Sequence, residues 1–225
     1  MRISDHSRRK ITGFTLIELL TVIAIIGILA SILIPTVSSV RASAHKAKTK
    51  VQFSQWTAAI ESFRSEYGYY PAFDPSNLVN PTGQNTDPAS VHFFHDILAA
   101  NRREGSALPA FSSSTSAVQP EAQNRKRIVF YSFGEGDYTP VDSIAPNLIQ
   151  DAFGNTEIAV IVDRNLDGKI DGADIGTLPT VNGMRPTTGS NTADFPTTGL
   201  RARVVFYAPK PGADATNPEF IFSWK

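Results

Sequence analysis

The longest apolar run of the chain lies near its start, from Gly13 to Pro35. Between Phe14 and Ile34 it holds about 21 residues, which as an α-helix would measure roughly 31 Å and match the hydrocarbon core of a bilayer. One acid, Glu18, interrupts it. A charge in hydrocarbon costs on the order of 2.5–3.5 kcal/mol on insertion scales, so Glu18 is a candidate functional residue. The pattern predicts a membrane-spanning helix over residues 14–35; the simpler alternative for Glu18 is an anchor whose carboxylate reaches the interface.

Residues 36–68 combine apolar and polar positions with helical spacing, and no Pro or Gly lies between Thr36 and Tyr67. Two apolar series follow one another, each with steps of three and four: Val37, Val40, Ala44, Ala47 and Val51, then Phe53, Trp56, Ile60, Phe63 and Tyr67. At about 100° per residue the two series lie on nearly opposite faces of one amphipathic helix. We expect the small-residue face to pack on neighbouring helices of a filament and the aromatic face to pack on the chain's own sheet. The alternative is a helix buried on both faces within one domain. Gly68, followed by Pro71, should end the helix.

Residues 69–225 supply enough chain for one small domain. Short runs rich in Val, Ile, Phe and Tyr predict strands over residues 127–133, 157–162, 201–208 and 219–224. A short helix is expected within residues 91–103. Polar segments at 74–90, 105–123 and 176–198 are rich in Ser, Thr, Pro, Asn and Gly and predict exposed loops. A long helix followed by antiparallel strands is typical of the α+β class.

Charge and composition remove several function classes. The chain has 21 basic and 21 acidic residues, no net charge and no cysteine, so we expect no nucleic-acid partner and no disulfide. It contains no nucleophile motif, phosphate-binding loop or paired-acid signature, and we therefore predict that it is not an enzyme. His92, His95 and Asp96 have helical spacing, but no further ligand with matching spacing supports a metal site there.

The sequence Arg8-Arg9-Lys10-Ile11-Thr12-Gly13-Phe14-Thr15-Leu16-Ile17-Glu18-Leu19 resembles the prepilin cleavage and methylation signal. Type IV pilins and the pseudopilins of type II secretion share this signal. The resemblance implies that residues 1–13 are a leader, and that a prepilin peptidase cuts after Gly13 and methylates Phe14 on the cytoplasmic side. An ordinary secretory signal would instead be cut beyond its apolar region. The resemblance also implies that Glu18 pairs with the terminal amine of a neighbouring subunit, and that Pro35 lets the helix loosen as the subunit leaves the bilayer.

A second stretch, from Glu61 to Pro71, resembles the end of the long helix in major pseudopilins. With the lack of cysteine, it favours the pseudopilin branch and a pilin-like fold. We then expect a single-pass protein of the bacterial inner membrane with residues 69–225 in the periplasm. Its partners would be identical or related subunits, the prepilin peptidase and the inner-membrane secretion assembly platform. The leading hypothesis is a structural subunit of a type II secretion pseudopilus. The alternatives are a type IV pilus subunit for adhesion, motility or DNA uptake, and a monomeric membrane-anchored calcium-dependent binding module.

A calcium loop is predicted late in the chain, where the sequence fits the D-x-[DN]-x-[DN]-G pattern of EF-hand-like loops. The expected ligands are Asp163, Asn165, Asp167, the Lys169 carbonyl, Asp171 and Asp174. Gly168 would permit the sharp turn, whereas Gly172 and Gly176 argue against a following helix. The alternative is a hairpin turn held by Asp and Asn hydrogen bonds. Just upstream, residues 151–157 resemble, in degraded form, an Asp-Pro-Trp-Gly-Asn-Pro-Tyr element of major pseudopilins.

Overall fold

The computed structural model describes residues 14–73, 76–80, 87, 90–176, 178–189 and 193–225. The predicted leader, with Gly13, lies outside them, as do parts of two of the predicted polar loops. The chain divides into two compact units, Met1–Ala44 and His45–Lys225. Helix α1 (Leu16–Tyr67) contributes to both units.

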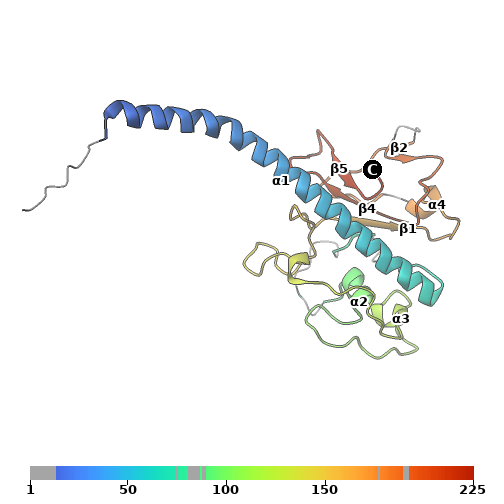
Figure 1. Ribbon diagram of the computed structural model, residues 1–225. Helices are drawn as coiled ribbons and strands as arrows, with labels where there is room; N and C mark the ends of the chain where they lie inside the picture. Colours follow the sequence, from blue (N-terminus) through green and yellow to red (C-terminus); the bar gives the residue numbers. More distant parts are fainter. Residues whose placement is uncertain (1–13, 74–75, 81–86, 88–89, 177, 190–192) are drawn as a thin grey trace, which may run out of the picture. The chain divides into compact units, whose positions relative to one another are not determined.

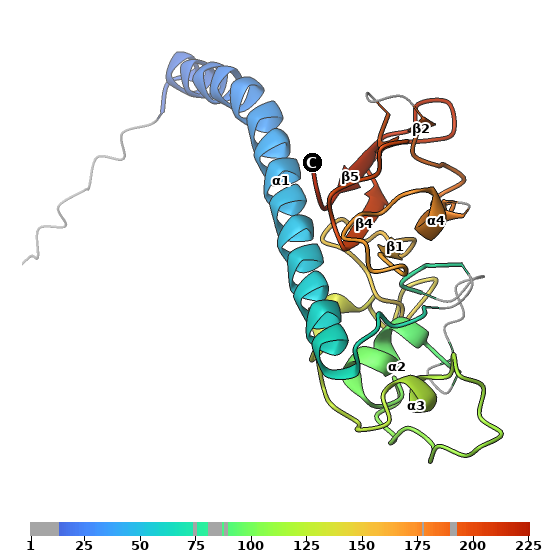
Figure 2. The same cartoon turned by 90° about the vertical axis from the view of Figure 1, so that its right-hand side faces the viewer.

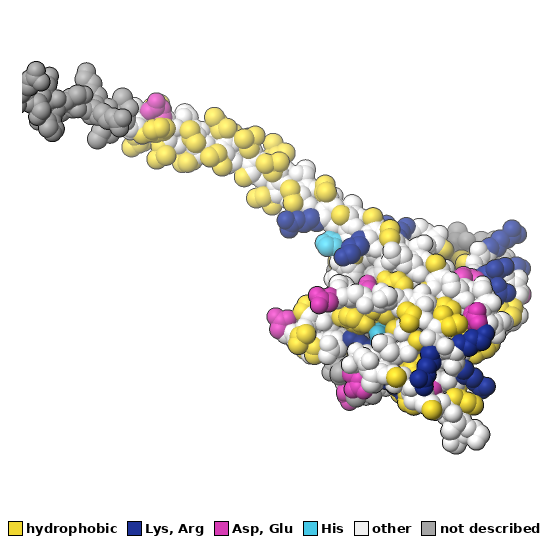
Figure 3. Space-filling view, turned by 60° about the horizontal axis from the view of Figure 1, so that its bottom comes forward, with side chains coloured by type: hydrophobic (Ala, Val, Ile, Leu, Met, Phe, Trp, Pro, Cys, Tyr) yellow, Lys and Arg dark blue, Asp and Glu magenta, His cyan; other side chains and the backbone are white. Residues whose placement is uncertain are grey.

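The described part of the first unit is helical from Leu16 onward and presents its large apolar side chains to the surroundings (Figure 3). The helix continues through Pro35, whose ring removes a backbone donor. The hydroxyl of the next residue, Thr36, donates to the carbonyls of Ile32 and Leu33 in the preceding turn, at 3.3 and 2.8 Å. Among the described helices, α1 is long and apolar enough to cross a membrane.

In the second unit, α1 lies against a small antiparallel sheet (Figures 1 and 2). The aromatic series predicted to pack on the sheet does so: Phe53, Trp56, Ile60 and Phe63 are fully buried. Ala47 and Val51, from the small-residue series, are exposed. The helix is therefore buried on one face only, and the alternative of a helix buried on both faces is wrong. It ends at Tyr67, and Gly68 follows with a φ of 80°, as the sequence predicted.

The sheet has three strands in the order β1-β4-β5: β1 (Ala159–Val162), β4 (Val204–Pro209) and β5 (Phe220–Phe222). Both neighbouring pairs are antiparallel, with Val160 opposite Phe206 and Tyr207 opposite Phe222. This arrangement confirms the α+β, pilin-like expectation and three of the four predicted strands. The remaining elements are short. They are α2 (Phe93–Ala99), α3 (Pro120–Gln123), the 3₁₀ turn η1 (Glu135–Asp137), α4 (Gly172–Ile175) and the parallel pair β2 (Thr188–Gly189) and β3 (Phe195–Pro196).

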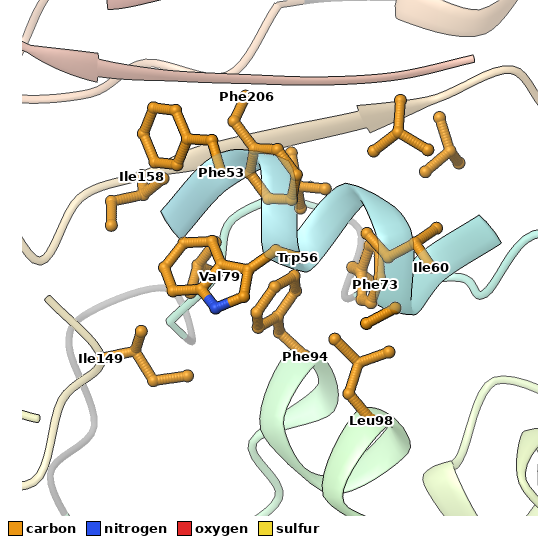
Figure 4. Close-up of a cluster of buried hydrophobic side chains, with 14 of the residues drawn as sticks. Phe53, Trp56, Ile60, Phe73, Val79, Phe94, Leu98, Ile149, Ile158 and Phe206 are labelled. Carbon is orange, nitrogen blue, oxygen red and sulfur yellow. The ribbon is translucent and has the colours of Figure 1, made fainter. Parts of the chain in front are cut away.

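The two faces of the sheet bury different side chains. The inner face packs on α1 and α2, and Figure 4 shows Trp56 of α1 beside Phe94 of α2, with Phe206 of β4 closing the cluster. The outer face carries Ile161 and Tyr207 and forms a second cluster. Burial on both faces explains why β1 and β4 read as nearly continuous apolar runs instead of alternating ones.

Two sequence expectations are wrong. Residues 127–133 form no strand: Arg127 has a φ of 53°, and the amides of Phe130 and Tyr131 both donate to the Leu98 carbonyl, at 2.8 and 3.1 Å. The aromatic side chains of this segment serve the core, since Phe130 packs on Phe63 at 5.3 Å between ring centroids.

The polar segment at 176–198 is not simply an exposed loop. Its few apolar residues, Leu178, Val181, Met184 and Phe195, are buried in the cluster on the outer face of the sheet. The physical reason is that this face is itself apolar and must be covered. Sparse apolar positions within a Thr- and Gly-rich segment gave no periodic signal of this role.

Candidate functional site

The start of helix α1 is held by a capping box between Thr15 and Glu18. One carboxylate oxygen of Glu18, Oε2, accepts from the Thr15 amide at 2.9 Å and from the Thr15 hydroxyl at 2.6 Å. In return, the Glu18 amide donates to the Thr15 hydroxyl oxygen at 3.3 Å. This is the reciprocal S/T-x-x-E arrangement that satisfies amide groups at a helix start. Glu18 therefore has a local structural role within its own chain.

The capping box leaves half of the Glu18 carboxylate open. Within residues 14–73, only the Oε2 atom is engaged, and the residue is exposed. A carboxylate offers about four lone-pair sites, so the Oε1 atom can accept a further donor without breaking the cap. Phe14, which precedes the cap, is 76% exposed and lies one helical turn before the acid.

The Asp163–Asp174 loop is closed by two buried carboxylates. Asp163 follows β1 and accepts from the amides of Asp167 and Gly168, at 3.2 and 2.8 Å. At the far end, Asp174 folds back and accepts from the amides of Arg164 and Asn165, at 2.8 and 3.3 Å. The first and last predicted ligands are 1% and 5% exposed, and both belong to the same hydrogen-bonded loop.

The middle of this loop turns sharply and is pinned to the domain. Gly168 has a φ of 86°, a conformation that glycine adopts without strain. Ile170 is fully buried and exchanges both backbone hydrogen bonds with Leu200, each 2.9 Å long. A side chain at Gly199 would meet the Asp171 Cβ at 3.1 Å, so the close approach of the two segments requires a glycine there.

A short helix, α4, forms inside the predicted loop and ends at Ile175. No further helix occurs in the described residues that follow it, as the sequence predicted. Asp171 caps α4 by accepting from the Ala173 amide at 2.8 Å, while Asp174 accepts from the Asp171 amide at 3.2 Å. This second capping box outweighs the low helix propensity of Gly172, the first residue of the turn. The helix lies inside the predicted loop, because Asp174 belongs to it.

The side chains of the Asp163–Asp174 loop are engaged in hydrogen bonds with the backbone of the loop. In the described parts of the chain, no group of three or more His, Cys, Asp or Glu side chains is gathered as metal ligands. The side chains of Asn165, Asp167 and Asp171 accept from backbone amides two residues ahead, at 2.8–3.0 Å. These are the hydrogen bonds of the alternative turn. Calcium binds oxygen ligands that need not all be acids. The sequence order of the oxygen-bearing side chains, and the hydrogen bonds of Asp174 to the first residues of the loop, are compatible with such a ligand set.

The degraded element at residues 151–157 is a tight turn that joins α1 to the sheet. Asp151 accepts from the Phe153 and Asn155 amides at 2.8 and 2.9 Å, and the Asn155 side chain donates both to Asp151 and to the Pro209 carbonyl. Burial raises the pKa of Asp151, and the hydrogen bonds from Asn155 oppose that shift. The Ala152 amide donates to the Thr49 hydroxyl at 3.3 Å.

His92, His95 and Asp96 lie together at the start of α2, in the buried interior. Asp96 is fully buried and accepts from the His92 amide at 3.2 Å and from Arg102 Nη1 at 2.8 Å. His95 Nδ1 lies 2.9 Å from Asp96 Oδ1. Burial lowers the pKa of both histidines, and Asp96 opposes this in each case. The sequence gives no signal for this pairing, because Arg102 lies six positions after Asp96 and beyond the end of α2.

Comparison with known proteins identifies the amino-terminal segment. The prokaryotic N-terminal methylation motif matches residues 8–34. The amino-terminal segment is pilin-like. The chain is 42% identical to the type IV major pilin protein PilA of Myxococcus xanthus (strain DK1622) over 73 residues, 32% of this chain and 33% of that one. It is 33% identical to the type II secretion system core protein G of Vibrio cholerae over 66 residues, and 34% identical to that of Escherichia coli (strain K12) over 71 residues.

The pilin-like segment accounts for part of each relative. The match spans 29% of this chain and 45% of the Vibrio protein, and 32% of this chain and 46% of the Escherichia protein. The chain thus spans between a third and less than half of the length of these relatives. No solved structure matches the chain. Pilins and pseudopilins are structural subunits and not enzymes.

The matched motif contains Gly13, Phe14 and Glu18, and Pro35 directly follows it. Phe14, Glu18 and Pro35 are in or next to α1, and Gly13 lies outside the described residues. The sequence reading missed Thr15, although the spacing Thr15-x-x-Glu18 is itself the signature of a capping box.

Proposed function

We propose that this protein is a structural subunit of a type II secretion pseudopilus, assembling through its amino-terminal helix into a periplasmic filament that supports protein export. The single observation that carries the proposal is the pilin-like segment, which is similar to core protein G of the type II secretion system in two organisms. The lack of cysteine and the Glu61–Pro71 stretch favour the same branch.

The exposed apolar surface supports assembly. Large side chains along the first unit, such as Ile23 and Leu29, are 59% and 55% exposed, as expected for a helix that needs lipid or neighbouring helices around it. In the second unit, Val51 is 57% exposed on the helix face opposite the core. Under this proposal the subunit is held in the inner membrane by one helix before assembly, with its second unit in the periplasm. Processing by the prepilin peptidase and docking on the secretion platform belong to the same proposal.

A type IV pilus subunit is the second candidate, and one observation favours it. The matched segment is 33% of the Myxococcus pilin but 45% of core protein G from Vibrio, so the pilin is closer in length to this chain. Deletion of the gene separates the two candidates. We expect the deletion strain to retain secreted enzymes inside the periplasm while surface fibres stay unchanged. Loss of fibres with normal secretion would contradict the pseudopilus proposal.

We also propose that the Asp163–Asp174 loop binds calcium as a stabilising ion of the domain. Asp163, Asn165, Asp167, the Lys169 carbonyl, Asp171 and Asp174 would hold it. Asp163, Asn165 and Asp167 occupy the first, third and fifth positions of an EF-hand-like loop. Asp174, the last predicted ligand, accepts hydrogen bonds from the amides of Arg164 and Asn165 at the beginning of the loop. A bound cation would also offset the repulsion among four carboxylates in one loop.

Calcium is therefore expected to raise the melting temperature of the full-length chain in detergent. At a calcium concentration of about 100 Kd, the added stability is about 2.7 kcal/mol, or roughly 5–10 °C for a domain of this size. Asp163→Ala should abolish the rise, whereas Asp142→Ala, at an exposed acid outside the loop, should keep it. Equal responses of wild type and Asp163→Ala, measured by calorimetry with and without a chelator, would contradict the calcium proposal.

A further inference from the structure

A cavity of about 270 Å³ opens beside the end of α2, and its lining includes no residue of the Asp163–Asp174 loop. One wall comes from α2 and the residues after it, including His95, Asn101 and Arg103. The opposite wall comes from residues 129–138, including Tyr131 and Tyr138. Residues 129–133 of this wall belong to the segment that forms no strand, in which the Phe130 and Tyr131 amides donate to the Leu98 carbonyl.

Arg103 brings a positive charge to the wall of this cavity, and no acid among the described residues accepts a hydrogen bond from it. Its guanidinium lies over the Tyr138 ring, 4.6 Å from the centroid, and its Nη1 atom is buried without a hydrogen-bond acceptor. None of the ion pairs among the described residues includes it. Burial lowers the pKa of Arg103, and Tyr138 and Asp96 oppose the shift. Arg103 is half-buried, and an anion that accepts from its unpaired Nη1 group would stabilise it.

The neighbouring Arg102, unlike Arg103, forms ion pairs with acids of the same domain. Its Nη1 atom donates to the fully buried Asp96 at 2.8 Å, and its Nη2 atom lies 3.7 Å from Glu121. Both arginines line the cavity, but they differ: Arg102 completes the buried network of α2, whereas Arg103 keeps an Nη1 atom without an acceptor. Asp96 is therefore already paired with Arg102.

The same cavity also offers hydrogen-bond acceptors. His95 is 4% exposed, and its Nδ1 atom is bonded to Asp96, which assigns the proton to Nδ1 and leaves the lone pair on Nε2. Nε2 makes no hydrogen bond with the described residues. The Asn101 side-chain oxygen is buried and also lacks a donor. A ligand that satisfies the cavity needs an anionic group for Arg103 and a donor for Asn101 or His95.

We propose that this cavity is a binding site for a small hydroxycarboxylate. The carboxylate would accept from Arg103, and the hydroxyl would donate to Asn101 or to His95 Nε2. A hydroxyl suits the site better than an ammonium group, because a second positive charge beside Arg103 would be repelled. The cavity volume lies just below the roughly 300–1,000 Å³ typical of pockets for drug-sized ligands, which limits the ligand to a small molecule. The proposal stands independently of filament assembly.

The test compares L-lactate with lactamide on the full-length chain in detergent, with binding measured by ligand-observed NMR and by the shift in melting temperature. Lactamide has the same hydroxyl and nearly the same shape but no charge. We expect saturable lactate binding that is about tenfold or more tighter than lactamide binding, since a charge-assisted hydrogen bond is lost with the amide. No saturable lactate binding to the folded protein, or equal binding of lactate and lactamide, would overturn the proposal.

Three variants locate the binding. Arg103→Gln should weaken lactate binding about tenfold or more, and Arg201→Gln, at an exposed cation elsewhere, should leave it within about twofold. Ala99→Leu fills the cavity from α2 with a good helix former and touches no charge, so it tests the site even if Arg103→Gln fails to fold. Undiminished binding in folded Ala99→Leu would overturn the assignment to this cavity. Inorganic phosphate that competes as strongly as lactate would overturn the hydroxycarboxylate class.

Discussion

Replacement of Trp56 by alanine is expected to lower the free energy of unfolding of the second unit by about 3–5 kcal/mol. Trp56 is fully buried and joins three elements, with ring centroids 5.2 Å from Phe94 of α2 and 5.6 Å from Phe206 of β4. The loss is a large fraction of the roughly 5–15 kcal/mol that stabilises a typical domain.

Val51→Ala is the matched control for this prediction, because it shortens a side chain on the exposed face of the same helix. Val51 is 57% exposed, so its replacement should change the free energy of unfolding by no more than about 0.5 kcal/mol. Urea unfolding of both variants in detergent, followed by circular dichroism, measures the difference. Similar losses in the two variants would contradict the assignment of the aromatic face to the core.

Loss of the negative charge at Glu18 is expected to prevent filament assembly while membrane insertion stays intact. Under the proposed function, the carboxylate pairs with the terminal amine of a neighbouring subunit in a low-dielectric environment. Removing one partner of such a pair costs about 3–5 kcal/mol, which corresponds to a loss of about 100-fold or more in association. Filament yield and membrane fractionation of Glu18→Ala, expressed in the native host, measure the two effects separately.

Glu18→Gln separates the charge from the helix cap. Glutamine also completes a capping box, so this variant keeps the Thr15 hydrogen bonds and loses only the charge. We expect it to fail in assembly as Glu18→Ala does, and Thr15→Ala to assemble within about twofold of wild type. Normal filaments from Glu18→Gln would mean that the acid acts through the cap alone, and poor insertion of either Glu18 variant would place its role in the membrane instead.

The elements with regular periodicity were predictable from the sequence. The apolar run and the two opposite helical series between Thr36 and Tyr67 anticipate α1, and Gly68 marks its end. Three β-branched and aromatic runs anticipate the strands within one to three residues at most ends. In each case the repeated pattern has one physical cause, which is either the burial of one face of the element or the passage of the helix through a bilayer.

The rest depends on contacts between residues far apart in the chain. Residues 127–133 have strand composition, but a positive φ at Arg127 and two amides donating to one carbonyl hold them as a loop. The apolar residues within 176–198 are too widely spaced to show that they cover the sheet. Likewise, Arg102 pairs with the buried Asp96, and the Arg103 Nη1 atom is left without an acceptor. No local sequence pattern predicts which of the two arginines forms the pair.

Mass spectrometry of the amino terminus of the protein purified from its native host tests the pilin-like account most directly. Cleavage after Gly13 exposes the amine that Glu18 is proposed to meet, and methylation marks the enzyme that made the cut. The account predicts a chain that begins with N-methylated Phe14 and keeps its apolar helix. A chain that still begins with Met1, or one that begins near Ala44 after loss of that helix, would contradict it.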